Sequence, residues 1–126
     1  MGILPDQTPT KLHAGLCEAA AEKGDLSALQ RLRDKECPWN VLRCAYAAEG
    51  GHLEVLQWLR EHDCPWDRRT CRLAALRGHL RVLDWSLDNG CPVGLDYLQT
   101  LSVHPYIKRN VRAWLKAYIE RQMLEA

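Results

Sequence analysis

Apolar and small residues follow a helical pattern along this chain, and the pattern repeats every 27 residues. The segment 51–59, GHLEVLQWL, returns at 78–86 as GHLRVLDWS, and its Leu, Val and Trp side chains are spaced to share one helix face. A second helical run, rich in Cys and Ala, precedes each of these segments. Self-similarity at a fixed period is typical of a stacked array in which each unit covers the apolar face of its neighbour.

Each unit carries the signals of two short helices. Asn40 and Asp67 can cap the first helix with their side chains, and a glycine turn separates it from the second. Pro65 and Pro92 then prevent the second helix from continuing and force an extended connection. Helices of this length are marginal alone, so we expect their stability to come from packing between units.

The start of the chain follows the same pattern. A helix is expected from Thr8-Pro9 to Lys23, because Thr is a good cap and Pro is favoured in a first turn. Gly24 ends that helix, and Asp25 can cap the next one. The sequence Gly24-Asp25-Leu26 is therefore the first copy of the Gly-His-Leu turn.

The end of the chain departs from it. Val103-His104-Pro105-Tyr106 stands where Gly-His-Leu is expected, and a last helix is predicted at roughly Ile107 to Leu124. One face of this helix is expected to be apolar and the other charged, as in a repeat that caps an array. The apolar face comprises Val111, Trp114, Leu115, Tyr118 and Gln122, and the charged face comprises Lys108, Arg112 and Lys116.

We therefore predict an all-α fold, a helical solenoid of about four stacked helix pairs joined by short connections. The 126 residues are expected to form one domain. Its units are predicted at 8–39, 40–66, 67–93 and 94–126, the last being the cap.

Composition narrows the function classes. The formal net charge of +1 gives no global field that would attract nucleic acid or an anionic membrane. No apolar run approaches the length that spans a bilayer, and the first residues lack the pattern of a signal peptide. We expect a cytoplasmic or nuclear protein without a membrane partner.

The six cysteines fill two slots of the repeat, and no C-x-x-C pair of the kind common in zinc sites occurs. We interpret them as small apolar residues at tight packing positions, with metal binding and disulfides as alternatives. The two sets are Cys17, Cys44 and Cys71, and Cys37, Cys64 and Cys91.

Residues 47–59, AAEGGHLEVLQWL, resemble the ankyrin-repeat signature, and residues 74–85 repeat most of it. The ankyrin period is about 33 residues, so the shorter period here is similar to short ankyrin variants that carry Cys-Pro-Trp. The resemblance implies an ankyrin-like solenoid in which the projecting hairpin loops are reduced and the concave groove is mostly helical. It also implies that His52 and His79 hold the turn by hydrogen bonds.

No catalytic motif accompanies these histidines: no nucleophile elbow, phosphate-binding loop or H-E-x-x-H is present. We expect no catalytic residue, no metal and no cofactor. Trp58, Trp85 and Trp114 are expected in the core. Trp39 and Trp66 are expected to pack between units, or to act as binding anchors if they are exposed.

Slots that differ between copies are free to carry specificity, and similar slots line the groove of ankyrin proteins. The residues predicted to contact a partner are Tyr46, Glu49, Arg72, Leu76 and Arg77. The first interpretation of the basic clusters at 68–77 and 108–116 is a solvated face. Binding of an acidic protein is the second interpretation, and binding of nucleic acid is the third.

The function that follows is non-catalytic protein–protein binding through the concave groove, by a monomer with no small-molecule substrate. The partner's identity is not encoded in any motif. Two alternatives stay open: a structural spacer or remnant of a repeat array, and a metal-binding protein or enzyme in which several thiols or polar groups converge.

Overall fold

The computed structural model describes the backbone of residues 10–34 and 39–125 and the side chains of residues 16–32 and 39–125. These residues form helices joined by turns and short connections, with no strand among them. The helices are α1 (Thr10–Lys23), α2 (Leu26–Asp34), α3 (Val41–Glu49), α4 (Leu53–Glu61), α5 (Arg68–Leu76), α6 (Leu80–Asp88), α7 (Leu95–Ser102) and α8 (Arg109–Glu125).

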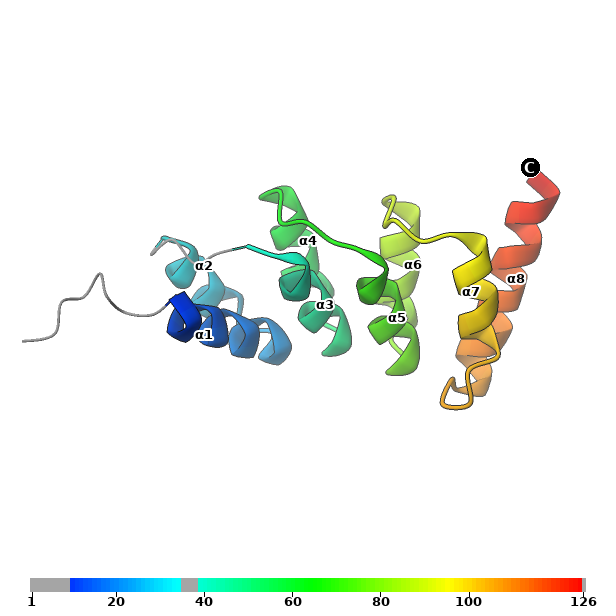
Figure 1. Cartoon of the computed structure of the whole chain (residues 1–126), viewed down its shortest axis with the longest axis horizontal. Coiled ribbons are helices and arrows are strands. Elements are labelled where there is room, and N and C mark those ends of the chain that lie inside the picture. Colours follow the sequence, from blue (N-terminus) through cyan, green and yellow to red (C-terminus); the bar gives the residue numbers. More distant parts are fainter. Residues whose placement is uncertain (1–9, 35–38, 126) are drawn as a thin grey trace, which may run out of the picture.

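The helices stand in two parallel rows (Figure 1). The first helix of each pair lies in one row, α1, α3, α5 and α7, and the second in the other, α2, α4, α6 and α8. Contacts join α1 to α3 and α3 to α5 along the first row, and they join the two helices within each pair. The predicted all-α, ankyrin-like helical solenoid is therefore confirmed. No helix of the described residues is both long and apolar enough to cross a membrane.

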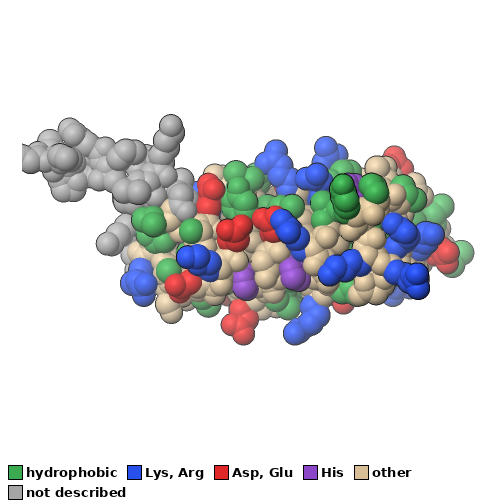
Figure 2. All heavy atoms as spheres, turned by 90° about the horizontal axis from the view of Figure 1, so that it is seen from below, with side chains coloured by type: hydrophobic (Ala, Val, Ile, Leu, Met, Phe, Trp, Pro, Cys, Tyr) green, Lys and Arg blue, Asp and Glu red, His purple; other side chains and the backbone are tan. Residues whose placement is uncertain are grey.

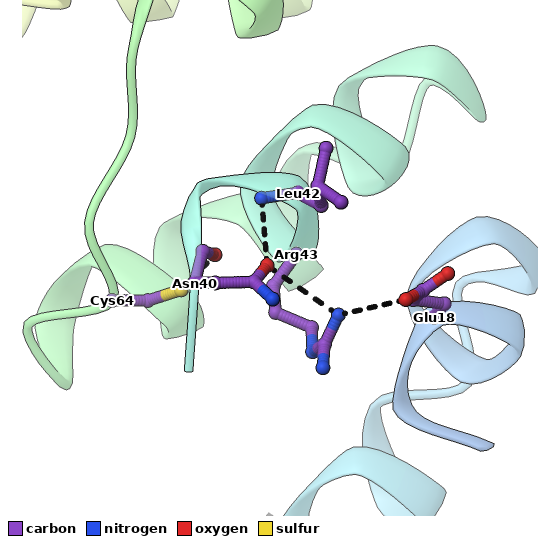
Figure 3. Close-up of polar contacts among 5 residues, drawn as sticks. All are labelled: Glu18, Asn40, Leu42, Arg43 and Cys64. Atoms are coloured by element: carbon purple, nitrogen blue, oxygen red, sulfur yellow. Dashed lines mark hydrogen bonds and ion pairs between the residues drawn. The ribbon is translucent and has the colours of Figure 1, made fainter. Parts of the chain in front are cut away.

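Side-chain caps start the helices where the sequence predicts them. The side-chain oxygen of Asn40 accepts a hydrogen bond from the backbone N–H of Leu42 at 2.8 Å (Figure 3), and Asp67 accepts one from Arg69 at 2.9 Å. The carboxylate of Asp25 accepts one from Ala28 at 3.0 Å. Each bond satisfies a backbone donor that the helix itself leaves free. The cap expected at Thr8 lies outside the described residues.

Small residues on the first helices let neighbouring helices approach closely. Cys44, Ala47 and Ala48 of α3, and their counterparts in α5, are fully buried between the two rows. The second helices contribute larger groups to the same core, which continues from one unit to the next. The buried members of α4 and α6 are Val55, Leu56, Leu59, Val82, Leu83 and Ser86.

The repeat histidines join each unit to the one before it. His52 Nε2 lies 2.8 Å from the carbonyl oxygen of Glu22, and His79 Nε2 lies 3.0 Å from that of Glu49. Both carbonyls belong to the preceding unit, so the predicted hydrogen bond spans the boundary between units. Gly51 is required there because its φ is +75° and a Cβ would come within 2.7 Å of the His79 ring.

Tryptophans also cross the boundaries, on the side of the second helices. Trp39 meets Trp58 edge-on with 5.7 Å between ring centroids, and Trp66 meets Trp85 in the same way at 5.9 Å. The prediction that Trp39 and Trp66 pack between units is confirmed. Trp58, Trp85 and Trp114 are half-buried at the edge of the core, so their predicted place inside the core is only approximate.

A buried cation lies at the boundary between α1 and α3. Arg43 is fully buried, and its Nη1 donates to Glu18 at 3.4 Å and to Asn40 at 3.5 Å (Figure 3). Its Nε and Nη2 have no hydrogen-bond partner among the described residues. Thr70 occupies the same slot one unit later and is also fully buried. Pairing keeps such a charge tolerable, because a buried ion without a partner is costly.

The last helix begins later than predicted, since Ile107 lies in the turn before α8. Val111 and Leu115 of the predicted apolar face are fully buried, and Ile119 extends that face. Trp114 and Tyr118 stack on each other at its edge, with 5.5 Å between ring centroids. The connections before α5 and α7 span residues 62–67 and 89–94 as turns and extended chain, in keeping with reduced hairpin loops.

These connections provide a test of backbone strain. Asp63 and Gly90 occupy the same slot, and both have positive φ, at 63° and 83°. Replacing Asp63 by Gly is expected to raise the free energy of unfolding by up to about 1 kcal/mol, because glycine adopts this conformation without steric cost. Gly90→Ala is the matched change: nothing lies within 4 Å of the added Cβ, so its loss of roughly 1 kcal/mol reports φ alone. Urea denaturation measures both, and a more stable G90A would contradict the assignment.

The histidine bridges provide a second test. His52→Ala and His79→Ala are each expected to lower the free energy of unfolding by about 1–3 kcal/mol, because a backbone carbonyl loses its partner and the unit boundary loses packing. His62→Ala is the control, since His62 is exposed and, among the described residues, its ring contacts Trp58 of the same unit and no neighbouring unit; its cost is expected to stay within about 0.5 kcal/mol. Equal losses in all three variants, measured by thermal and urea unfolding, would refute the bridging role.

Candidate functional site

A cavity of about 430 Å³ opens where α3, α5 and the turn after α7 meet, and we call it the α5 pocket. Four of the five predicted contact residues line it, and Tyr46 does not. Tyr46 is half-buried and packs against the core. The lining residues are Glu49, Arg72, Leu73, Leu76, Arg77, His104 and Tyr106.

Two of the charges in the α5 pocket neutralise each other. Arg77, the residue that ends α5, donates from Nη2 to Glu49 at 2.8 Å across the boundary between units. Arg77 is 60% exposed, so water screens this pair and its contribution to stability is small. Arg72 is exposed and forms no ion pair with any described residue. It therefore remains available as a cation at the rim of the pocket.

Apolar groups complete the site. Leu73 and Leu76 are half-buried in the pocket, and the turn beside it exposes 68% of Val103 and 80% of Tyr106. Exposed apolar groups of this size close together are a feature of interaction surfaces. Sequence reasoning missed Tyr106. Its signal was the stretch 103–106, which replaces the Gly-His-Leu turn of the other units.

A single arginine holds this turn. Arg112 of α8 donates from Nε to the carbonyl of Ser102 at 2.9 Å and from Nη2 to that of His104 at 3.1 Å, with Ile107 O at 3.5 Å. The placement of Arg112 on the charged outer face is wrong: it is half-buried, because its planar guanidinium satisfies several carbonyls of the turn. The turn is further shaped by His104, whose Nδ1 accepts from the backbone N–H of Tyr106 at 3.1 Å.

Other basic residues at the start of α5 have partners within the chain. The guanidinium of Arg68 lies 4.6 Å from the ring centre of Tyr97, and Arg69 is 3.8 Å from the carboxylate of Asp67. Figure 2 shows Lys and Arg side chains over the C-terminal half of one face, with acidic side chains and histidines toward its middle. The positive charge is thus partly compensated, which weakens the case for a polyanionic ligand.

Cysteine chemistry differs between the units. Cys44, Cys64, Cys71 and Cys91 are free and buried, whereas Cys17 is disulfide-bonded, so the filler interpretation is wrong for Cys17. Cys37 lies outside the described residues. Within the described residues, no group of three or more His, Cys, Asp or Glu side chains is placed to hold a metal ion.

A second cavity, of about 520 Å³, lies on the side of the second helices, between α4 and α6. Its walls include Trp66 and Trp85, and the guanidinium of Arg60 sits 4.5 Å from the ring centre of Trp66. Arg60 also donates from Nη1 to the carbonyl of Cys64. Its cation and its aromatic rings are thus already engaged with one another, unlike Arg72 and Tyr106 at the α5 pocket.

Residues 44–85 match the family model described as ankyrin repeats (many copies), from Cys44 in α3 to Trp85 in α6. These residues are similar to ankyrin repeats. A search of the curated proteins and a search of the solved structures each gave no match. The matched ankyrin segment spans the two helix pairs that carry the fullest signature, α3–α4 and α5–α6. Membership in a short Cys-Pro-Trp class of ankyrin repeats stays a prediction.

Ankyrin repeats generally mediate protein–protein interaction, and the family is typically non-catalytic. The α5 pocket lies at the C-terminal side of the matched segment, where that segment meets the α7–α8 pair. The surface at this junction combines residues of the repeat, such as Arg72 and Leu76, with Tyr106 of the turn after α7, which has no counterpart in the repeat.

The turn that borders the pocket can be tested through its anchor. Arg112→Lys is expected to lower the free energy of unfolding by about 1–3 kcal/mol, because an ammonium cannot replace a planar fork that bonds several carbonyls. Hydrogen exchange of the amides at 103–107 is expected to accelerate in this variant. Arg109→Lys is the control because Arg109 is exposed at the start of the same helix. Unchanged exchange in R112K would show that the turn is held by other contacts.

Proposed function

We propose that this chain is a non-catalytic module that binds a protein partner across the α5 pocket and the neighbouring turn at 103–106. The observation that carries the proposal is the meeting of an unpaired cation, Arg72, with the exposed ring of Tyr106 around one cavity. Tyr and Arg are the residue types that most often dominate binding energy at protein interfaces. Tyr46, Glu49, Leu76 and Arg77 are proposed to contribute at the edges of the same surface.

The scaffold favours binding on energetic grounds. The α5 pocket is built on helices that stack on both sides, so little conformational entropy is lost when a partner binds. Leu73 and Leu76 offer an apolar floor, and Arg72 can pair with an acidic side chain at its rim. The partner expected is therefore a protein segment with an apolar anchor beside an Asp or Glu. We propose that the chain acts as a monomer in the cytoplasm or nucleus.

A nucleic-acid ligand is disfavoured by the same charges. The net charge is +1, and Arg68, Arg69 and Arg77 each engage a group of the chain itself. A protein that binds the phosphate backbone of a nucleic acid needs several free cations that neutralise phosphates together. A role as a spacer alone would leave the exposed Val103 and Tyr106 without a function.

The experiment starts with proximity labelling or pull-down of the full chain to identify a partner, followed by calorimetry with the purified partner. Arg72→Glu and Tyr106→Ala are each expected to weaken the measured affinity at least about tenfold, as loss of a hot-spot side chain does. Leu76→Ala is expected to have a smaller effect because part of its area is already covered by the core.

Matched controls use the row of second helices. Arg81→Glu reverses an exposed cation on α6, and Asp84→Arg reverses an exposed anion on the same helix. Both are expected to leave the affinity within about twofold, since rim charges outside an interface contribute little. If R81E and D84R abolish binding while R72E and Y106A bind normally, the partner uses the other face and the proposal fails.

A further inference from the structure

In the units built on α3–α4 and α5–α6, a thiol on the first helix meets a thiol that follows the second helix. Cys44 Sγ donates to the carbonyl oxygen of Cys64 at 3.9 Å, and the side chains of Cys44 and Cys64, like those of Cys71 and Cys91, interact with each other. The two pairs are copies of one arrangement, 27 residues apart. All four side chains are buried, and Cys91 is the most exposed, at 6%.

Backbone groups hold the second thiol of each pair in place. Cys64 Sγ lies 3.5 Å from the carbonyl oxygen of Asn40, and Cys91 Sγ lies 3.3 Å from that of Asp67. Asn40 and Asp67 are the cap residues of α3 and α5, so each thiol is fixed at the start of the first helix of its own unit. Figure 3 shows the sulfur of Cys64 directed toward Asn40.

Packing alone does not account for this arrangement. A small apolar filler needs no partner of its own type, yet in each of these units a second buried thiol lies beside the first. Cys17, in the slot that Cys44 and Cys71 occupy in later units, is disulfide-bonded. A metal is not favoured, since no third ligand joins either pair among the described residues. The chemistry common to all of these observations is formation of a disulfide.

We propose that Cys44–Cys64 and Cys71–Cys91 are dithiols that a small disulfide such as oxidised glutathione converts reversibly into disulfides within each unit, with Cys64 and Cys91 as the attacking sulfurs. The thiolate of Cys64 attacks one sulfur of the oxidant, and the first glutathione leaves as a thiolate that takes up a proton. Cys44, deprotonated, then attacks the mixed disulfide at Cys64 and releases the second glutathione. Two electrons and two protons pass from the protein to the oxidant.

The environment of the thiols supports this order. The hydrogen bond that Cys44 donates lowers the pKa of Cys64, and that of Cys71 lowers the pKa of Cys91. The same bonds, together with burial, raise the pKa values of Cys44 and Cys71. Because the thiolate is the nucleophile, the second thiol of each pair attacks first. Attack requires transient opening of the connection that carries it, so the reaction is slower than that of an exposed thiol.

Oxidation would tie the first helix of a unit to the connection after its second helix, 20 residues along the chain. Such a link constrains the unfolded chain, so the oxidised form is expected to be the more stable one. Cytosolic disulfides are usually transient and redox-sensing. A disulfide that is reduced again when the ratio of reduced to oxidised glutathione rises has this character.

The test uses the full chain in folding buffer with graded ratios of reduced to oxidised glutathione, acid quenching, alkylation and peptide mass spectrometry. Expected are the links Cys44–Cys64 and Cys71–Cys91, their reversal by excess reduced glutathione, and a rise in Tm of roughly 10 °C on oxidation. Links between the two pairs, no link at all, or a lower Tm of the oxidised chain would overturn the proposal.

Single substitutions identify the attacking sulfur. Cys44→Ala should leave Cys64 trapped as a mixed disulfide with glutathione, since the resolving thiol is gone. Cys64→Ala should leave Cys44 unmodified on the same time scale, and the untouched Cys71–Cys91 pair reports whether each variant still folds. Trapping at Cys44 in C64A but not at Cys64 in C44A would overturn the assignment of roles. The wild-type links decide the dithiol claim even if both variants unfold.

Discussion

The hydrogen bond from a histidine ring to a carbonyl of the preceding unit fixes the step from one helix pair to the next. His52 reaches Glu22 and His79 reaches Glu49, so each turn is tied to a backbone group that its own unit does not supply. This contact requires a glycine where the ring passes, and it brings the first helices to a distance that small Cys and Ala side chains largely fill. The continuous core and the surface along α5 both follow from that spacing.

Much of the fold could be predicted because the same pattern of caps, glycine turns and apolar positions occurs several times in the sequence. Asn40 and Asp67 are the caps that the sequence indicated, and Trp39 and Trp66 lie between units as expected. Repetition separates structural slots from incidental ones without any second sequence. Where the repetition stops, prediction weakened. Arg112 looks like part of a solvated face, but it is drawn inward by carbonyls of a turn that has no counterpart earlier in the chain.

The candidate site shows the same division. Glu49, Arg72, Leu76 and Arg77 were chosen because their slots vary between copies, and the α5 pocket brings these four together. The neutralising pair of Glu49 and Arg77 could not be foreseen from slots alone, since it depends on how a helix end meets the cap of the following helix pair. Tyr106 was missed because it belongs to no slot. Candidate contact residues are thus found at the irregular end of the chain as well as in the repeated slots.

The buried guanidinium of Arg43 limits which units can pack against each other. Its carboxylate partner, Glu18, exists only in the first helix pair, because the same slot holds Ala45 and Arg72 in later ones. A misthreaded or domain-swapped assembly that placed α3 against another copy's α3 or α5 would bury this cation beside a methyl group or a second cation, at a cost of several kcal/mol. Near-identical units invite such slippage. The buried charge of Arg43 therefore favours pairing with the first unit, which supplies the carboxylate, over pairing with a copy of a later unit.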